Sequence, residues 1–338
     1  PLYEKKHFSV VLLDEGQYIK NTYAQKSKAV KELDATSRFA LTGTPIENNL
    51  NDLWSIFDFL MPSYLGDNES FQEQYVKNDK NAALRSLITP FLLRRSKEEY
   101  LKDLPKKSVQ VVTLSMNDEE RSLYDATLLD AKNLLKKGEK GIPIFALLTQ
   151  LREICVDPSA FFDGMPPVSS KICYVLESIS EAINNGHKVL LFSSFTKVLD
   201  HLRYLLDEEH LSSYYINGDT ESSLRQKIST SFNTSDQVKI LLVSLKAGGS
   251  GLNLQGADTV FHLDPWWNLA AEEQATDRTH RIGQTRPVQV FKLVCHDSIE
   301  EKVLLLQEKK KALYRSVIVE GEEGITHFSI EDLLYLLS

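Results

Sequence analysis

The chain has 338 residues, of which 42% are hydrophobic and 25% charged, and its net charge is −8. This length predicts about two domains, and the composition is that of a globular protein without the basic excess of one that coats nucleic acid. No apolar run approaches the roughly 20 residues of a membrane span, and we recognise no signal peptide. The three cysteines (Cys155, Cys173 and Cys295) lack zinc-site spacing. A reduced, cytoplasmic protein without membrane partners is expected.

The first segment reads as strand, helix and strand. Residues 8–13 (FSVVLL) form a continuous apolar run, which predicts a parallel strand buried on both faces. The sequence DEGQ follows at residues 14–17. A helix over residues 25–33 leads to a short strand over residues 38–41, and the turn sequence TGTP follows at residues 42–45.

From about residue 47 to residue 160 helical spacing dominates, with one strand-like interruption. The sequence NDEE at residues 117–120 predicts a helix start, and the segment DGMPPVSS at residues 163–170 is the best linker candidate. The expected elements are helices over residues 53–60, 82–88 and 119–136 and a strand over residues 109–114.

After the linker, helices and strands alternate, which predicts a doubly wound α/β domain. The last long helix is opened by the capping box Ser298-x-x-Glu301. The expected helices cover residues 171–184, 197–208, 222–232, 270–280 and 299–317, and the expected strands cover residues 188–193, 214–216, 239–244, 259–263 and 288–293.

Two polar segments follow strands of the first part. Asp14 and Glu15 come at the carboxyl end of a strand, where α/β sheets bind ligands, and two adjacent carboxylates favour a bound cation such as Mg²⁺. The alternative is an acidic pair opening a surface loop. Thr42 and Thr44, with Gly43 between them, could sense phosphate or contact the two acids, or could form an ordinary turn.

The segment from residue 241 to residue 268 carries two further signals. Its glycine-rich part, SLKAGGSGLN at residues 244–253, exposes backbone N–H groups and adds lysine and serine donors, which suits a phosphate. A functionless turn is the alternative. Trp266 and Trp267 follow the next strand, and we expect one to fill the core and the other to meet bases or a groove.

A cluster of cations follows in QATDRTHRIGQ at residues 274–284. On a continuous helix Gln274, Arg278 and Arg281 would project from one face. Two arginines aimed at one spot suit a transferring phosphoryl group. The alternative is a solvated basic face paired with Asp277 or Glu273.

Taken in order, these motifs resemble those of the SWI/SNF-related (Snf-two type) branch of the superfamily-two helicase-like ATPases. DEGQ looks like the Walker B box, LTGTP with IENNLNDLWSIFDFLMP like the third motif and its trailing helix, and FLLRRSKEEYLKDLPKK like the segment closing the first lobe. VLLFSSF, INGDT with Arg225 downstream, LLVSLKAGGSGLNLQGAD and QATDRTHRIGQ look like the second-lobe motifs, so the resemblance covers nearly the whole chain.

The resemblance implies an α/β fold of two RecA-like lobes, with helical protrusions between them, that bind ATP and Mg²⁺ in the cleft and duplex DNA across it. By the same resemblance each candidate residue has a role. Asp14 and Glu15 would hold Mg²⁺ and activate water, and Arg278 and Arg281 would be arginine fingers. The residues beside the nucleotide would be Gln17, Gly251 and Gln274, and those facing DNA would be Ser193, Gly218, Thr220, Ser244, Lys246 and Trp267. ATP hydrolysis and DNA binding would be coupled through Thr42, Gly43 and Thr44.

One departure concerns the Walker A loop, G-x-x-x-x-G-K-[ST], which occurs nowhere in the 338 residues. We therefore expect an incomplete first lobe, a missing upstream half that carries this loop, and little or no ATP hydrolysis by the chain alone. The expected domains are residues 1–114 (first lobe, with a helical insertion from about residue 46), 115–166 (protrusion and linker), 167–317 (second lobe) and 318–338 (tail with a terminal helix).

Two functions of different classes remain open. The first is a DNA-stimulated ATPase that translocates on duplex DNA, and the second is a nucleotide-dead binding or scaffold module of the same fold. An RNA helicase is disfavoured by RIGQ and by the helical insertion after TGTP. The compact second lobe favours a bacterial source, where the protein would be associated with the nucleoid.

Overall fold

The computed structural model describes residues 3, 6–43, 50–78, 81–93, 95, 97–137, 142–248, 251–315 and 336–337, of which residues 81, 98, 99 and 309–315 are described by their backbone alone. The chain divides into two compact units. Unit 1 consists of Pro1–Arg94 with Glu308–Asp332, and unit 2 consists of Arg95–Gln307 with Leu333–Ser338.

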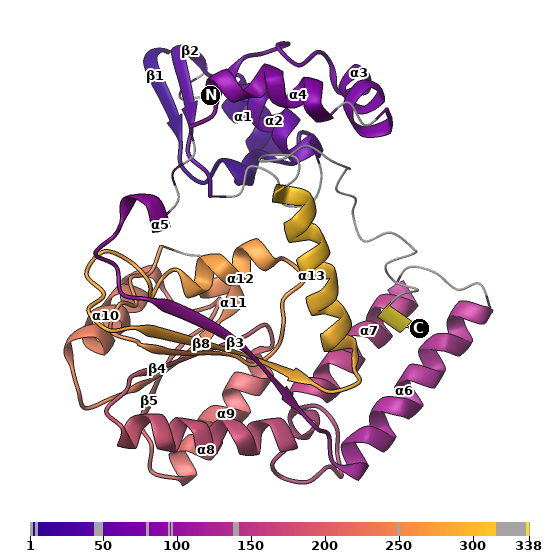
Figure 1. Cartoon of the computed structure of the whole chain (residues 1–338), viewed down its shortest axis with the longest axis vertical. Coiled ribbons are helices and arrows are strands. Elements are labelled where there is room, and N and C mark those ends of the chain that lie inside the picture. Colours follow the sequence, from indigo (N-terminus) through magenta and orange to yellow (C-terminus); the bar gives the residue numbers. More distant parts are fainter. Residues whose placement is uncertain are drawn as a thin grey trace. The chain divides into compact units, whose positions relative to one another are not determined.

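Unit 1 contains a two-stranded parallel sheet (Figure 1). Strands β1 (His7–Leu13) and β2 (Asp34–Ala40) pair in register, so that Leu12 lies opposite Phe39. The expectation that β1 is buried on both faces is wrong for the described residues, because Leu12 and Phe39 are each 54% exposed. Within unit 1 the described helices leave one apolar face of this pair uncovered.

Helices make up the rest of unit 1, as the predicted insertion requires. Helix α2 buries Leu50, Leu53, Trp54 and Phe57, whose spacing places them on one helical face. Phe71 and Leu84 of the following helices pack on the same face. The elements are a 3-10 helix Gly16–Ile19, α1 (Gln25–Lys31), α2 (Leu50–Leu60), α3 (Asn68–Phe71), a π-helix Gln72–Lys77, α4 (Asn81–Ile88) and a 3-10 helix Thr89–Phe91.

Unit 2 is built on a six-stranded, wholly parallel sheet with the order β3-β8-β7-β4-β6-β5. Its strands are β3 (Lys107–Leu114), β4 (Val189–Ser193), β5 (Ser213–Ile216), β6 (Ile240–Ser244), β7 (Thr259–His262) and β8 (Val288–Cys295). Its helices are α5 (Lys97–Tyr100), α6 (Asp118–Lys136), α7 (Ile142–Val156), a 3-10 helix Pro158–Ala160, α8 (Ser170–Asn184), α9 (Thr196–Glu208), α10 (Ser222–Thr234), α11 (Leu245–Gly248), α12 (Leu269–Thr276) and α13 (Ile299–Arg315), which runs on into unit 1.

The central strands are buried on both faces, as their continuous apolar runs predict. Successive residues of β4 point to opposite sides of the sheet, so Leu191 packs in the layer of α8 and α9 while Leu190 packs in the layer of α10, α11 and α12. After β4 the chain forms β5 and β6, which lie on one side of β4 in the sheet, and later forms β7, which lies on the other side of β4. The strand order therefore reverses at β4, and ligands of doubly wound sheets bind beyond the carboxyl ends at such a point.

Strand β3 belongs to the sheet of unit 2 and not to the first lobe, where residues 1–114 were assigned. It pairs with β8 along its whole length, from Lys107 opposite Val288 to Leu114 opposite Cys295. The pairing gives the edge of β8 a hydrogen-bonded neighbour. The sequence of a strand does not show which sheet the strand joins. Because β3 lies in the sheet of unit 2, the predicted first-lobe boundary at residue 114 lies too far along the chain.

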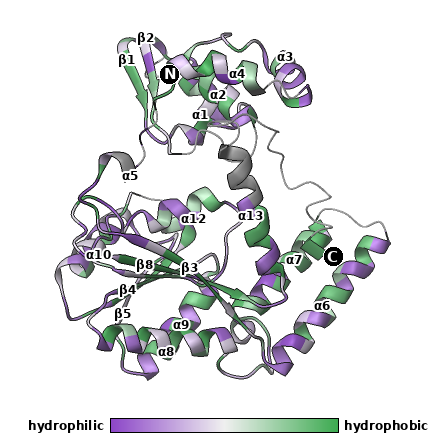
Figure 2. Ribbon diagram, in the orientation of Figure 1, coloured by the Kyte–Doolittle hydropathy of each residue, from purple (hydrophilic) through white to green (hydrophobic). Residues whose placement is uncertain are grey.

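Helices α6 and α7 form a hairpin that also belongs to unit 2. Asn117 and Glu120 form the capping box expected at the start of α6. Arg121 donates hydrogen bonds to the carbonyls of His296 and Asp297, which joins α6 to the turn after β8. Figure 2 shows α7 as a largely apolar helix and α6 as a mixed one, consistent with α7 lying deeper in the unit.

The end of the chain is described only at Leu336 and Leu337, which are helical and buried. The Lys302 ammonium donates a hydrogen bond to the Leu336 carbonyl over 3.4 Å, so these two residues pack back on unit 2 as expected of the terminal helix. The remainder of the expected helix, residues 330–335, lies outside the described residues. Among the described helices, none is long and apolar enough to cross a membrane.

Candidate functional site

The two acids after β1 are joined to the turn after β2 by side-chain hydrogen bonds. The Gln17 amide donates to Glu15 Oε2 over 2.6 Å, and the Thr42 hydroxyl donates to Gln17 Oε1 over 2.7 Å. The backbone N–H of Gly16 also donates to the Leu41 carbonyl over 2.8 Å. The predicted contact between the TGTP turn and the acids is therefore made through Gln17.

The geometry of this half-site suits a hydrated divalent cation. Asp14 is exposed and Glu15 is half-buried, with a left-handed backbone (φ 54°) that turns it back toward the sheet edge. Carboxylate oxygens are the ligands that Mg²⁺ takes in proteins, usually with several waters kept. Gly43 is exposed beside Thr42, and Thr44 lies outside the described residues.

In unit 2 the glycine-rich segment begins with the short helix α11. Lys246 is exposed on it, whereas Ser244, at the end of β6, is 4% exposed with its hydroxyl buried. Gly248 leaves little room for a side chain, because an added Cβ would lie 3.0 Å from the Phe192 ring. The segment is thus packed tightly on β4 and exposes Lys246, while Gly249 and Ser250 lie outside the described residues.

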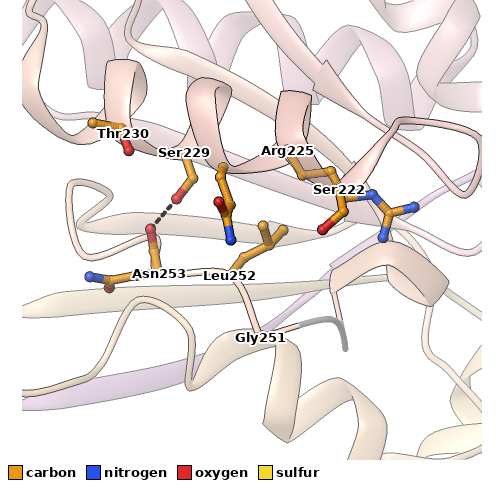
Figure 3. A pocket seen from close by; sticks show the side chains of 8 residues that line it. Ser222, Arg225, Ser229, Thr230, Gly251, Leu252 and Asn253 are labelled. Carbon is orange, nitrogen blue, oxygen red and sulfur yellow. Dashed lines mark hydrogen bonds between the residues drawn. The ribbon is translucent and has the colours of Figure 1, made fainter.

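A polar pocket of about 320 Å³ lies between α10 and the end of this segment (Figure 3). Ser229 closes its floor by donating a hydrogen bond to the Asn253 carbonyl over 2.5 Å. Gly251 is exposed at its edge and has φ +66°. The lining residues are Ser222, Arg225, Gln226, Ser229, Thr230, Gly251, Leu252 and Asn253.

The three residues expected on one helical face do not share a helix. Helix α12 ends at Thr276, so it carries Gln274 but neither arginine. Arg278 is 4% exposed, and its carbonyl accepts a hydrogen bond from the Leu254 backbone. Arg281 is half-buried and its guanidinium lies 3.4 Å from the Leu252 carbonyl. The structure thus brings both arginines to the glycine-rich segment, through turns and not through helical periodicity.

The first residue after α12, Asp277, is held by residues far away in the chain. Asp277 pairs with Lys97 over 2.7 Å and with Lys107 over 3.1 Å. Burial alone would raise the pKa of Asp277, but these two lysines outweigh it and hold the pKa below its usual value. Gly283 has φ +103°, a backbone conformation in which a side chain is strained, so this turn favours glycine.

A second loop of unit 2 carries Gly218 and Thr220, which were assigned to DNA. Gly218 is exposed and Thr220 half-buried, so both can be reached from solvent. The Arg225 guanidinium donates to the Thr220 carbonyl over 2.7 Å, the Gly218 carbonyl over 2.7 Å and the Asn217 carbonyl over 3.1 Å. Arg225 therefore fixes the backbone of this loop.

Ser193 differs from its expected role as a DNA contact. It is fully buried, and its hydroxyl donates to Asp264 Oδ1 over 2.7 Å. Asp264, also fully buried, accepts a further bond from the Ser194 N–H over 3.0 Å. Ser193 therefore links the ends of β4 and β7, because its side-chain hydroxyl is hydrogen-bonded inside the unit.

The two tryptophans that follow Asp264 are both half-buried. Trp266 packs against the apolar layer of α10, α11 and α12, which fits the expected core role, and Trp267 is the next residue of the same turn. Both rings lie against the Arg152 guanidinium of α7, at 5.6 and 5.1 Å from the ring centroids. The sequence analysis missed Arg152, although a charged residue inside an apolar helix is a signal of a specific partner.

One buried group contains possible metal ligands. Ligand atoms of Cys155, Cys295 and Glu300 lie within 4.8 Å of one another. The Lys171 ammonium, however, donates to both Glu300 oxygens, at 2.7 and 2.9 Å. The negative charge there is already balanced, so the group fits a buried ion pair and not a cation site.

The parallel sheets, the acid pair at a strand end and the arginines held at a glycine-rich segment are the features expected of the helicase-like class of proteins with RecA-like lobes. Comparison with known families identifies the family. A model of the SNF2-related domain matches residues 2–160, and a model of the helicase conserved C-terminal domain matches residues 170–283. The chain belongs to the SNF2 family, whose members are ATP hydrolases, and the family resemblance is confirmed.

Similar proteins extend over nearly the whole chain. An uncharacterized ATP-dependent helicase of Mycoplasma genitalium is 38% identical over 98% of this chain and 33% of its own length. A putative ATP-dependent helicase/translocase of Bacillus subtilis is 34% identical over 98% of this chain and 38% of its own length. The Sulfolobus solfataricus SWI2/SNF2 ATPase core in complex with double-stranded DNA has a TM-score of 0.56 and 33% identity, covering 99% of this chain and 74% of that one. The chain thus spans about a third of the curated relatives' length.

Proposed function

We propose that the intact protein is an ATP-dependent translocase that moves on duplex DNA without obligatory strand separation. The observation that carries the proposal is the presence in one chain of two half-sites, the acids Asp14 and Glu15 after β1 and the arginines Arg278 and Arg281 at the glycine-rich segment. Membership of the SNF2 family and the likeness to a core solved with double-stranded DNA support it.

In this proposal the acids hold Mg²⁺ through Asp14 and polarise the attacking water through Glu15. Mg²⁺ bound with the nucleotide neutralises charge that develops on the phosphates. Gln17 holds the Glu15 carboxylate and reaches Thr42, so it orients the base and links it to the next strand end. Arg278 and Arg281 stabilise the transferred phosphoryl group, and Gly251 and Gln274 lie beside the nucleotide.

The DNA contacts of the proposal are Gly218, Thr220, Lys246 and Trp267, which are exposed or half-buried. Ser193 and Ser244, which were also assigned to DNA, are buried and are not among these contacts. Such backbone contacts bind DNA of any sequence and weaken with salt.

The test measures ATP hydrolysis by the full-length protein with and without duplex DNA. Stimulation by duplex, lost in Glu15→Gln and in Arg281→Ala, is the expected result. A rate that duplex DNA leaves unchanged contradicts the translocase. Full-length protein that binds duplex but does not hydrolyse ATP would instead support the nucleotide-dead scaffold.

We further propose that residues 1–338 alone do not turn over ATP, because they contain no Walker A sequence. A segment that carries the phosphate-binding loop would cover the open apolar face of β1 and β2, where Leu12 and Phe39 are half exposed. ATP turnover by these residues alone, abolished by Glu15→Gln, contradicts this. Leu12→Asp should block capture of the separately expressed segment, with the exposed Leu129→Asp of unit 2 as the matched control.

A further inference from the structure

Arg152 lies at the junction of three segments of unit 2. It projects from α7 and is 5% exposed. Its Nη2 donates to Asp264 Oδ2 over 2.9 Å and to the Ser194 hydroxyl over 3.0 Å. These two acceptors follow β7 and β4, so one guanidinium joins α7 to the carboxyl ends of two neighbouring strands.

The same guanidinium is enclosed by aromatic rings. Its carbon lies 5.0 Å from the centroid of Phe195, 5.1 Å from Trp267 and 5.6 Å from Trp266. Cations over aromatic faces at such distances attract the rings, most strongly when water is excluded. The planar guanidinium can stack on rings and donate in its own plane at the same time, which a lysine cannot do.

Other contacts fix the backbone of the tryptophan turn, beside the Trp267 ring that lies against Arg152. The backbone N–H of Trp266 donates to Glu272 Oε2 over 2.9 Å, and the Glu272 carboxylate pairs with Lys292 over 2.6 Å. Gln307 donates to the Trp266 carbonyl. These bonds hold the backbone of the turn at Trp266, and the Arg152 guanidinium lies against the ring of the next residue, Trp267.

We infer that Arg152 is a positioning residue for nucleic acid. It holds the Trp267 ring and the Ser194 hydroxyl in the orientation in which the turn meets duplex DNA, and it does not touch the DNA itself. The inference rests on the proposed DNA-binding function. It assigns to α7, outside the motif segments, a direct part in shaping the DNA-contacting surface of unit 2.

The experiment labels the 338-residue chain with 5-fluorotryptophan, whose three ¹⁹F resonances are assigned with single Trp→Phe variants. Trp54 lies in unit 1 and serves as an internal control. In Arg152→Met we expect the Trp266 and Trp267 resonances to shift and the Trp54 resonance to stay. Duplex affinity should fall roughly tenfold, because binding must then fix a Trp267 ring that Arg152 no longer orients. Arg152→Lys, which keeps a charge for Asp264, replaces this variant if it fails to fold, with a smaller loss in the same direction.

Two comparisons separate positioning from other roles. Arg152 makes no phosphate contact in this inference, so the slope of log K against log salt should not change, whereas loss of a phosphate contact lowers it by about one. The matched control is Arg121→Met, which removes a guanidinium that donates to two carbonyls and lies 5.4 Å from the Tyr124 ring, away from the tryptophan turn. It should leave the tryptophan resonances and the DNA affinity unchanged.

Four results would overturn the inference: unmoved Trp267 resonances, moved resonances with unchanged affinity, a reduced salt slope, or the same loss in Arg121→Met. Failure of the proposed function has a different signature. In that case the unsubstituted chain shows no salt-dependent affinity for duplex DNA. Both the proposed function and the DNA-positioning role of Arg152 are then refuted, whatever the ¹⁹F resonances show.

Discussion

The buried ion pair between Lys171 and Glu300 provides a stability prediction whose size follows from its contacts. Both side chains are 1% exposed or less. Lys171 Nζ donates to the Glu300 carboxylate at 2.7 and 2.9 Å, and to the carbonyls of Leu263 at 3.0 Å and Leu293 at 3.4 Å. The pair therefore joins the starts of α8 and α13 to the carboxyl ends of β7 and β8.

Removing one partner leaves a charge buried without compensation. Burial alone would lower the pKa of Lys171, but the neighbouring Cys295 and Glu300 outweigh it and raise the pKa, so the ammonium stays charged at neutral pH. Lys171→Met should reduce the free energy of unfolding by about 3–5 kcal/mol, a large part of a typical domain's 5–15 kcal/mol. The double variant Lys171→Met/Glu300→Leu should recover most of this loss, because no charge remains buried.

Urea denaturation followed by tryptophan fluorescence measures both variants at pH 7. Lys239→Met is the matched control, because Lys239 makes one 3.4 Å contact with the Ile183 carbonyl, and it should change the free energy of unfolding by less than about 0.5 kcal/mol. The reasoning is refuted if Lys171→Met lies within about 1 kcal/mol of the unsubstituted chain, or if the double variant is no more stable than the single one.

Three further predictions concern the turns of unit 2. Gly248→Ala, whose Cβ would lie 3.0 Å from the Phe192 ring, should cost about 1–3 kcal/mol in urea melts, whereas Gly218→Ala, with nothing within 4 Å, should cost almost nothing. The lowered pKa of Asp277 means that its stabilisation is fully present above the unfolded pKa and is lost as pH falls through the folded pKa, so Asp277→Asn should lower the urea midpoint at pH 7 by an amount that shrinks as pH falls below the ordinary aspartate pKa. Gln284→Ala removes the side-chain donor to the carbonyls of Gln255, Ala257 and Thr279, two of these bonds being buried, and should cost about 1–3 kcal/mol, measured as a lower melting temperature.

The strands of unit 2 were predictable because a parallel strand buried on both faces is a continuous apolar run. The runs at residues 188–193 and 239–244 correspond to β4 (Val189–Ser193) and β6 (Ile240–Ser244). The capping box of α6 was equally local, because Asn117 and Glu120 lie three residues apart. The capping box expected at α13 differs from the observed bonds by one residue at each end. The Ser298 hydroxyl accepts from the backbone N–H of Glu300 and not of Glu301, and the Glu301 carboxylate accepts from the backbone N–H of Asp297 and not of Ser298.

Features that depend on distant residues were not predictable in this way. Helical periodicity continued the helix of Gln274 through Arg278, but Lys97 and Lys107 hold Asp277 in a turn after α12. Strand β3 was assigned to the wrong lobe because pairing with β8 leaves no mark on its own sequence. Ser193 was assigned to DNA from its motif position, whereas the buried Asp264 takes its hydroxyl.

Both units place their polar groups by the same physical device. Parallel strands end at one edge of a sheet, so residues that follow neighbouring strands can meet through single side-chain hydrogen bonds. In unit 1 Gln17 joins Glu15, after β1, to Thr42, after β2. In unit 2 Asp264, after β7, joins the end of β4 and receives Arg152 from α7. Since each of these connections includes side-chain hydrogen bonds, a small change at one strand end can reorient side chains at its neighbour.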